Sequence, residues 1–517
     1  MDMGEPGDVT VGGMWEPIQY QFDNLPVHLA LLHTGKVLGF GGSCNDPTYF
    51  IDCRPAEVWD PQTGAIEVID QVLGGDIFCA GHTFLPDGRL LVAGGTYGYD
   101  VKRLGIVPLP PFSGLRQAYL FDPISQRWTR IDDMSVGRWY PSLIMLGNGE
   151  VLTMAGFTEH FPWVVLRRIE VYAPGSGWRE FKEAARWMPL YPRLHLLPNG
   201  DVFYAGSYNT HYTFPFTLSS FPTATLNPTT GAWKTIGLPK QAEREEGSTV
   251  LLALTPPDYR ARVLLMGGGL TTGTEATADA EIIDLSAETP AWESIASMHY
   301  ARYYCYAVLL PDQTVLVVGG REGLKGHQHT PGSEPTDDHI HLADVLPPPP
   351  QDPKAVRAAE IFDPATGQWT HAAPMQVDRL YHSGALLLPD GRVMVTGSNP
   401  ARGQADRRIE IYQPPYLFKG PRPVIESAPE AVNYGTAFEI VTPQAAEIDT
   451  VALIHPMSTT HCFSTEQRYV GLEITARQAD RIQVSVPTNR SLLPPGYYML
   501  FVLREGIPSV APFVRVS

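Results

Sequence analysis

The chain has 517 residues, of which 44% are hydrophobic and 18% are charged, a composition typical of a soluble globular protein with a sizeable core. Its 38 basic and 55 acidic side chains give a formal net charge of −17, which argues against nucleic acid or an anionic membrane as a partner. No apolar run is long enough to span a membrane, and the first residues lack the basic and then apolar segments of a signal peptide.

An internal repeat runs along most of the chain. Each copy combines an apolar strand, a turn such as Leu-Pro-Asp-Gly, a second apolar strand ending in Gly-Gly, a strand like Ala-Glu-Ile-Phe-Asp-Pro, and Gly-x-Trp. Five clear and two looser copies begin at His28, Cys79, Arg138, Tyr191, Gly247, Arg302 and Arg379. The first turn glycines, Gly35, Gly88, Gly149 and Gly200, are 53, 61 and 51 residues apart. A period near 50 is that of kelch repeats, so we predict an all-β fold with a seven-bladed kelch-type β-propeller over residues 1–420.

The two ends of the propeller must be joined to close the ring. The seventh repeat reaches Ile409 to Tyr416 and has no Gly-x-Trp strand after it, whereas the N-terminal segment has a tryptophan at Trp15. We therefore expect the strand near Trp15 to complete the seventh blade, which leaves no exposed sheet edge.

Two segments do not follow the repeat. Residues 421–517 contain alternating strands without a helical period, which predicts a C-terminal immunoglobulin-like (early-set) β-sandwich. An insertion in the sixth blade, residues 321–357, is rich in His and Pro. Its histidines could bind metal, although this composition favours a solvated loop; they are His327, His329, His339 and His341.

The repeat also predicts which side chains share the central channel, because the first strand of each blade lines it. Counting nine residues back from each turn glycine gives one ring of residues; Gln313 stands in for the glycine of the sixth blade. The ring members are Pro26, Cys79, Tyr140, Tyr191, Tyr304 and His382. The fifth blade is too irregular to count, and Tyr381 lies one residue outside the ring. A single tyrosine here would be explained as wall-filling, but a thiol, several phenols and an imidazole at one channel mouth favour a functional site.

Four segments resemble the copper radical oxidases, the family that includes galactose oxidase and glyoxal oxidase. They are GDIFCAG (75–81), GRWYPSLIML (137–146), RLYHSGALLLPDGRV (379–393) and TTHCFSTEQR (459–468). The resemblance covers nearly the whole chain and implies the same two-domain fold.

The resemblance also implies roles for individual residues. His382 and His461 would be neutral imidazole ligands of Cu(II). Tyr140 would be an equatorial phenolate joined by a thioether to Cys79, and Tyr381 would be the axial phenolate and base. The implied reaction is the two-electron oxidation of a small aldehyde or primary alcohol by a tyrosyl radical, with O₂ reduced to H₂O₂.

The residue types suit this chemistry. Two imidazoles, phenolate oxygens and an open position suit Cu(II) better than Mg²⁺ or Ca²⁺. Because copper stores one electron, a second store is needed, and the sequence has no GxGxxG opening a helix for an organic cofactor. Two alternatives stay open: a kelch-type interaction or glycan-binding protein without redox activity, and a copper-binding relative that has lost turnover.

One part of the sequence departs from the family. Galactose oxidase stacks a tryptophan over its radical tyrosine shortly after the Gly-Gly of that blade, and here this position falls on Phe157 and Thr158, followed by His160, Phe161 and Trp163. We therefore do not transfer galactose specificity, and shielding of the radical is in doubt. Tyr191, Tyr304 and Arg321 are candidate walls of the substrate pocket.

Less specific expectations complete the prediction. We expect a monomer acting on a small molecule and O₂. The resemblance suggests a secreted or extracytoplasmic protein, although the sequence itself leaves the compartment open. Cys44 and Cys53 are close enough in the chain to form a disulfide, and free thiols are equally compatible with their spacing.

Overall fold

The computed structural model describes residues 7–41, 56–98, 103–104, 107–108, 113–159, 165–206, 221–241, 244–269, 275–323, 351–399, 405–464 and 466–517. Regular structure in these ranges is almost entirely β. The helical elements described are α1 (Val9–Gly12) and two 3₁₀ turns, Lys182–Ala184 and Pro415–Phe418. None of the described helices is long and apolar enough to cross a membrane. The prediction of an all-β propeller fold is confirmed.

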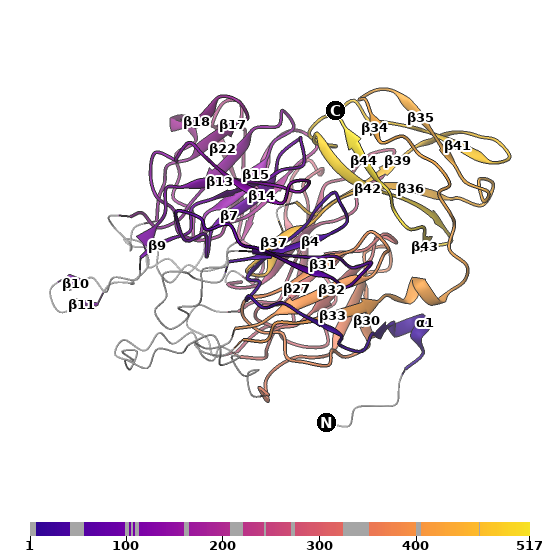
Figure 1. Ribbon diagram of the computed structural model, residues 1–517, viewed down its shortest axis with the longest axis horizontal. Coiled ribbons are helices and arrows are strands. Elements are labelled where there is room, and N and C mark those ends of the chain that lie inside the picture. The colour runs from indigo at the N-terminus through magenta and orange to yellow at the C-terminus, as the bar shows by residue number, and fades with distance from the viewer. Residues whose placement is uncertain are drawn as a thin grey trace.

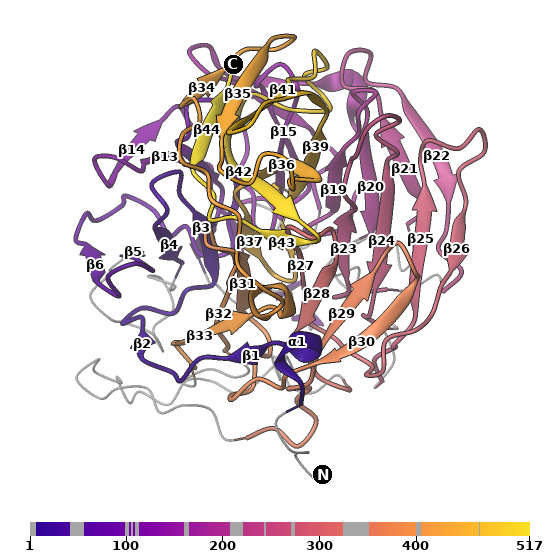
Figure 2. The same ribbon diagram turned by 90° about the vertical axis from the view of Figure 1, so that its right-hand side faces the viewer.

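Seven antiparallel sheets follow one another around a ring, as Figure 2 shows. The first three contain β3 (His28–Leu31), β4 (Val37–Phe40), β5 (Ala56–Trp59) and β6 (Ile66–Ile69); β7 (Gly81–Phe84), β8 (Leu90–Ala93), β13 (Ala118–Asp122) and β14 (Arg127–Ile131); and β15 (Ser142–Met145), β16 (Val151–Met154), β17 (Glu170–Ala173) and β18 (Gly177–Glu180). The next two contain β19 (Arg193–Leu196), β20 (Val202–Gly206), β21 (Thr223–Leu226) and β22 (Trp233–Gly237); and β23 (Ser248–Leu251), β24 (Arg262–Met266), β25 (Ala280–Asp284) and β26 (Trp292–Ser294). The last two contain β27 (Tyr306–Leu309), β28 (Val315–Val318), β29 (Ala359–Asp363) and β30 (Gln368–Ala372); and β31 (Ser383–Leu387), β32 (Val393–Gly397), β33 (Arg408–Gln413) and β1 (Met14–Trp15).

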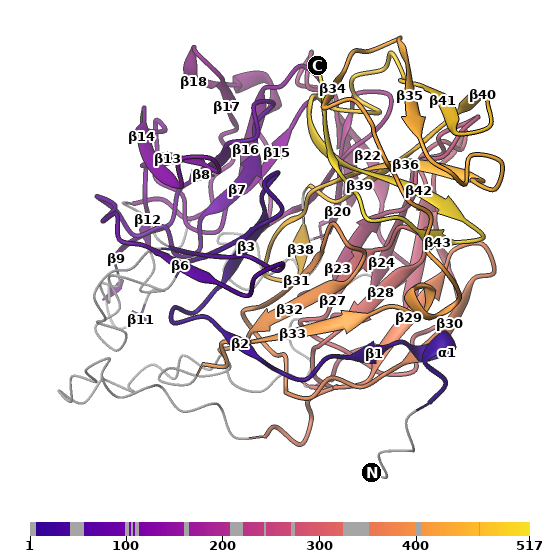
Figure 3. The ribbon, with the colours of Figure 1, turned by 45° about the vertical axis from the view of Figure 1, so that its right-hand side comes forward.

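The N-terminal strand occupies the outer position of the seventh sheet. Strand β1 pairs antiparallel with β33, so that Trp15 lies opposite Tyr412. The indole Nε1 of Trp15 donates to the carbonyl of Ala373 at 2.7 Å. This is the place where the seventh repeat lacks a Gly-x-Trp strand of its own, and β1 lies beside β33 in Figure 3. The strand β2 (Tyr20–Gln21) also pairs with β33. The predicted domain boundary at 420/421 remains a prediction.

A buried ion pair recurs in four blades, between an arginine that precedes the first strand and a glutamate of the third strand. The pairs are Arg138–Glu170 at 2.8 Å, and Arg244–Glu281, Arg302–Glu360 and Arg379–Glu410 at 2.7 Å. In each pair the side chains are no more than 3% exposed. Each arginine also donates to a carbonyl at the end of the second strand; Arg302, for example, bonds the carbonyl of Gly319 at 2.8 Å. The chain just before the first strand is thereby fixed to the second and third strands of its own blade.

The first blade lacks this arginine. Its third-strand glutamate, Glu57, instead accepts the backbone N–H groups of Asp23 and Asn24. Burial raises the pKa of Glu57 to about 7.

The C-terminal residues form two further sheets beside the propeller, drawn in orange and yellow in Figure 1. One contains β34 (Ala431–Val432), β44 (Phe513–Val516), β42 (Gly496–Arg504), β36 (Thr450–His455), β39 (Arg468–Leu472) and β43 (Ile507–Pro508), and the other contains β35 (Ala437–Val441), β41 (Arg481–Ser485) and β40 (Ile474–Arg477). Between β36 and β39 the chain leaves the sandwich and forms β37 (Ser458–Thr460) and β38 (Phe463–Ser464). Strand β37 pairs with β3, with His28 opposite Thr460. The C-terminal loop therefore enters the central channel as an added strand of the first blade.

Candidate active site

Apart from Pro26, the predicted ring of residues shares an unusual backbone conformation. Its members Cys79, Tyr140, Tyr191, Tyr304 and His382 all have positive φ, from 43° to 63°. Non-glycine residues rarely adopt this left-handed conformation, and where they do the site is often functional.

Backbone hydrogen bonds connect neighbouring members of the ring. The N–H of Tyr140 donates to the carbonyl of Cys79 at 3.1 Å, and the N–H of Tyr191 donates to that of Tyr140 at 3.0 Å. The N–H of Tyr304 donates at 3.1 Å to Glu246, whose φ is 58°. Glu246 is thus the ring member of the fifth blade, which sequence counting missed.

Two imidazoles and two phenols converge at the channel mouth. The Nε2 atoms of His382 and His461 are 3.1 Å apart, and His461 Nε2 lies 3.1 Å from the Tyr140 hydroxyl. That hydroxyl lies 2.5 Å from the hydroxyl of Tyr381. All four side chains are buried. The loops before β15 and β31 and the tip between β37 and β38 place them there, so the structure brings together all four metal ligands implied by the resemblance.

Cys79 completes this cluster. Its Sγ and the nearest ring nitrogens of His382 and His461 all lie within 4.8 Å of one another, and its thiol hydrogen-bonds with Tyr140. Burial raises the pKa of the Cys79 thiol and of the Tyr140 phenol well above their ordinary values. A buried anion without a counter-charge is costly, so a phenolate here requires a cation among these donors. Two nitrogens and two phenol oxygens are a donor set that fits Cu(II).

Thr460 defines the tautomer of His461. The Thr460 hydroxyl donates to the carbonyl of Val27 at 3.1 Å, and it lies 2.6 Å from Nδ1 of His461. Because the single hydroxyl proton is used on Val27, His461 Nδ1 carries the proton of the second bond. The lone pair on Nε2 therefore faces the cluster, as a metal ligand requires.

A second chain of hydrogen bonds fixes the backbone of Cys79. The N–H of Cys79 donates to His28 Nε2 at 3.1 Å, which leaves the proton of the neutral ring on Nδ1, 3.1 Å from His82 Nε2. His82 then donates from Nδ1 to the hydroxyl of Ser458. Burial lowers the pKa of both imidazoles, so both rings are neutral. These bonds tie the backbone of Cys79 to β37, the strand that leads to His461.

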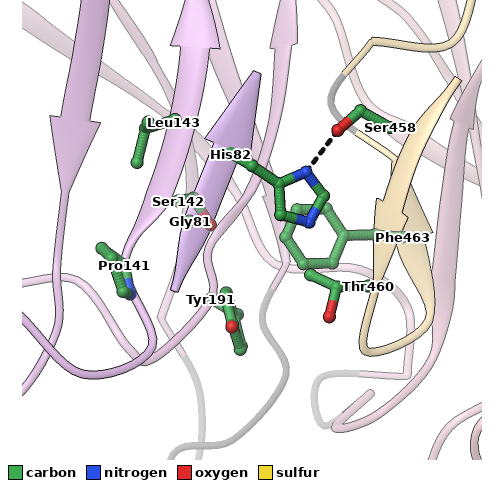
Figure 4. Close-up of a pocket in the computed structure, with 9 residues that line it drawn as sticks. All are labelled: Gly81, His82, Pro141, Ser142, Leu143, Tyr191, Ser458, Thr460 and Phe463. Atoms are coloured by element: carbon green, nitrogen blue, oxygen red, sulfur yellow. Dashed lines mark hydrogen bonds between the residues drawn. The ribbon is translucent and has the colours of Figure 1, made fainter. Parts of the chain in front are cut away.

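A small cavity lies beside this chain of hydrogen bonds, and Figure 4 shows His82 and Ser458 in it. Its lining also includes Tyr191, Thr460 and Phe463.

The residue that covers the Tyr140 ring is Trp139, which corrects the expectation from sequence. The rings of Trp139 and Tyr140 are nearly parallel, with an interplanar angle of 7° and centroids 3.6 Å apart. Phe157 stacks on Trp139 with centroids 5.6 Å apart and therefore lies behind the indole. His160, Phe161 and Trp163 are outside the described residues. The sequence feature that indicates this stacking residue is the tryptophan immediately before Tyr140 in GRWYP.

The other predicted pocket residues differ in position. Tyr191 stacks on Tyr140 with centroids 4.4 Å apart, and its hydroxyl donates to the carbonyl of Ala80 at 2.8 Å. The Tyr304 ring lies 5.4 Å from that of Tyr381. Arg321 instead forms an ion pair with Asp352 at 2.7 Å.

Several further sequence predictions fall on residues that the structure does not describe. These are His327, His329, His339 and His341 of the blade-six insertion, and the cysteines Cys44 and Cys53.

Comparison with known proteins agrees with this architecture. Residues 422–516 match the family model "Galactose oxidase-like, Early set domain". The chain is 29% identical over 480 residues to "Aldehyde oxidase GLOX" of Vitis pseudoreticulata, an alignment that covers 85% of this chain and 82% of the relative. It is 27% identical over 492 residues to "Galactose oxidase" of Gibberella zeae, covering 89% of this chain and 64% of the relative.

A solved structure resembles the whole chain. It is a fungal alcohol oxidase of the AA5 family in complex with copper, with a TM-score of 0.77 and 25% identity, and the match covers 98% of this chain and 99% of that one. The matched C-terminal domain, the two relatives and this structure show that the chain is similar to galactose oxidase-like oxidases, the resemblance that its four sequence segments predict.

Proposed function

We propose that this protein is a copper-dependent oxidase that oxidises small aldehydes or primary alcohols and reduces O₂ to H₂O₂. The observation that supports this proposal is the convergence of His382, His461, Tyr140 and Tyr381 next to the thiol of Cys79. A protein that only binds a partner through its kelch repeats has no evident use for this set of donors. The relatives named above act on aldehydes, galactose or alcohols, which is consistent with the substrate class.

The proposed roles follow from the contacts of each side chain. His382, His461, Tyr140 and Tyr381 would hold copper, which supplies one of the two oxidising equivalents and a binding position for the substrate oxygen. Tyr381 would accept the proton of the substrate hydroxyl. Tyr140, once linked to Cys79, would store the second oxidising equivalent as a radical. The rings of Trp139 and Tyr191 stack on the Tyr140 ring and would keep water away from it.

The thioether itself needs an oxidant. A bond forms between Cys79 Sγ and a ring carbon of Tyr140 next to the hydroxyl-bearing carbon, and the thiol hydrogen and the ring hydrogen are lost. O₂ takes up both hydrogens as H₂O₂. In turnover, an aldehyde reacts as its hydrate: R–CH(OH)₂ + O₂ gives R–COOH + H₂O₂, and a primary alcohol gives the aldehyde by the same balance.

The test starts from protein purified without metal, which is loaded with Cu(II) under O₂. We expect the intact mass to fall by two hydrogens, Cys79 to become resistant to alkylation, and a broad visible absorption to develop on oxidation. H₂O₂ should then form with aldehydes or primary alcohols in a peroxidase-coupled assay. Retention of an alkylatable Cys79 and of the full mass would contradict the radical site.

Two variants separate the roles of the sulfur and the imidazole. His461→Ala should weaken Cu(II) binding, whereas Cys79→Ser should retain it but lack the mass change and the visible absorption. Equal losses of Cu(II) affinity in the two variants would show instead that Cys79 is a metal ligand. A monomer and an extracytoplasmic location remain expectations, which size-exclusion chromatography and cell fractionation would check.

A further inference from the structure

The buried carboxyl group of Glu246 lies in the ring of active-site residues, and neither the sequence resemblance nor the proposed mechanism gives it a role. Glu246 is 6% exposed. Its φ of 58° is close to the 63° of Tyr140 and His382, which are members of the same ring. It follows Arg244 by two residues, as Tyr140 follows Arg138, and Arg244 is held by its ion pair with Glu281. The same construction that positions the radical tyrosine thus positions Glu246.

The ring has two halves with different chemistry. The proposed ligands and Cys79 come from the second, third and seventh blades and from β37, which lies on the first blade. The fourth, fifth and sixth blades contribute no proposed ligand, and their ring members are Tyr191, Glu246 and Tyr304. Strands of these three blades lie on the right and lower right of Figure 2. The ring members of this half are therefore not taken up by the proposed ligand set.

Within this half of the ring, the polar side-chain atoms differ in whether they have a hydrogen-bond partner. The hydroxyl of Tyr191 already donates to Ala80, and the hydroxyl of Tyr304 is hydrogen-bonded to the Glu246 carboxyl. The Tyr304 ring in turn packs beside the base, Tyr381. The other carboxyl oxygen of Glu246, Oε2, is buried and has no hydrogen-bond partner among the described residues. A buried oxygen without a partner costs about 1–3 kcal/mol, so such an atom is a candidate for binding a ligand.

The charges around Glu246 favour a neutral acid. Burial raises the pKa of Glu246 to about 8, and the neighbouring Glu245 acts in the same direction. The hydrogen bond with Tyr304 and the charge of Arg193 act in the opposite direction without cancelling the effect of burial. At neutral pH the carboxyl therefore has both a donor and an acceptor for a hydroxyl group, as buried carboxylic acids have in other active sites.

We propose that Glu246 binds the second hydroxyl of a hydrated aldehyde, and so makes the enzyme prefer aldehyde hydrates over simple primary alcohols. The two substrate classes differ at this point. A primary alcohol has one hydroxyl on the reacting carbon, which Tyr381 deprotonates. The hydrate has two, and the second would hydrogen-bond with the carboxyl group of Glu246. This inference rests on the proposed oxidase function and adds the residue that selects the substrate.

The test compares Glu246→Leu and Glu246→Gln with the wild type, all loaded with Cu(II) under O₂. The substrates are a strongly hydrated aldehyde, such as methylglyoxal, and an unbranched primary alcohol, 1-butanol. We expect Glu246→Leu to lower kcat/KM for the aldehyde about tenfold or more, mainly through KM, and to change that for the alcohol less than about threefold. Glu246→Gln keeps a hydrogen-bond donor and an acceptor, so its kcat/KM for the aldehyde should fall less than that of Glu246→Leu.

The control is Glu466→Gln, which alters another buried carboxyl with a pKa of about 8 that lines a different cavity and should leave the substrate preference unchanged. Copper affinity, the thioether mass change and the melting temperature report on the site itself and should match the wild type in Glu246→Gln. If the wild type forms no thioether or H₂O₂, the oxidase function fails. If the thioether and H₂O₂ form normally, but Glu246→Leu lowers kcat/KM equally for both substrates or for neither, the proposed role of Glu246 is wrong.

Discussion

Trp139 and Tyr140 are consecutive in the chain, yet their rings are stacked with centroids only 3.6 Å apart. Consecutive side chains of an extended strand point to opposite faces. The positive φ of Tyr140, 63°, removes this alternation and is compatible with the stacked arrangement. The tryptophan that covers the proposed radical thus comes from the same loop as the tyrosine. In galactose oxidase, by the resemblance discussed above, it comes from a later segment.

We predict that Trp139→Leu shortens the lifetime of the oxidised site. An aromatic pair contributes about 0.5–1.5 kcal/mol beyond its buried area, which corresponds to a change of about 2- to 10-fold. The decay of the visible absorption after oxidation measures the lifetime of the oxidised site. Phe157→Leu is the control, because Phe157 stacks on Trp139 and should have the smaller effect. Equal decay in wild type and Trp139→Leu would show that the indole does not protect the radical.

A second prediction concerns the hydrogen bond that orients His461. Thr460→Val keeps the shape of the side chain and removes the acceptor for His461 Nδ1. Loss of such a support typically weakens metal binding 10- to 100-fold, and we expect a loss in that range for Cu(II), measured by competition with a chelator. Thr459→Val is matched to it, since the Thr459 hydroxyl donates to the carbonyl of Phe463. Similar affinities in the two variants would remove the argument for the tautomer.

The register of the repeat explains how much of this site could be predicted. A regular interval between the turn glycine and the channel placed Cys79, Tyr140 and His382 on one ring. The fifth blade fails this count because its first turn contains Pro256 and Pro257 and is longer than the others. The spacing of arginine and ring residue would have found Glu246, since Arg244 precedes it as Arg138 precedes Tyr140.

Other features depend on contacts that no local pattern encodes. The chain of hydrogen bonds through His28 and His82 joins two blades and the C-terminal loop, and its proton positions follow only from the geometry. The insertion of β37 next to β3 likewise joins residues more than four hundred positions apart. The family resemblance supplied His461, but repeat counting could not have done so.

The recurring buried ion pairs lead to a third prediction. Glu360→Gln leaves the Arg302 guanidinium buried without its counter-charge, which typically costs about 3–5 kcal/mol. We expect a large decrease in the urea midpoint or the melting temperature. The exposed pair Arg481–Glu439 provides the comparison, and Glu439→Gln should change stability by less than about 1 kcal/mol. Comparable effects of the two substitutions would mean that the blade pairs do not stabilise the propeller.

A fourth prediction concerns pH and the buried cluster at the junction of propeller and C-terminal sheets. Glu466 lies 3.4 Å from His455 and lines a small cavity with Arg468. Burial raises the pKa of Glu466 to about 8 and lowers that of His455 to about 4. The folded protein therefore holds the Glu466 proton more tightly than the unfolded chain, in which the carboxyl has its ordinary pKa of 4.5. This contribution to stability is complete below pH 4.5 and is lost as the pH rises toward 8, by up to about 1.4 kcal/mol per pH unit.

Glu466→Gln removes this titration, so its stability should fall less than that of the wild type between pH 5 and pH 8, as measured by urea unfolding across that range. Glu447→Gln, at an exposed carboxyl paired with Arg504, should retain the wild-type slope. His455 acts in the opposite sense, because its lowered pKa costs stability as the pH falls from the ordinary value of 6.5 to about 4. The two effects overlap between pH 4.5 and 6.5, so the difference between the wild type and Glu466→Gln, which share His455, isolates the carboxyl. A wild-type slope in Glu466→Gln would show that the buried carboxyl ionises without penalty, with water in the cavity solvating its charge.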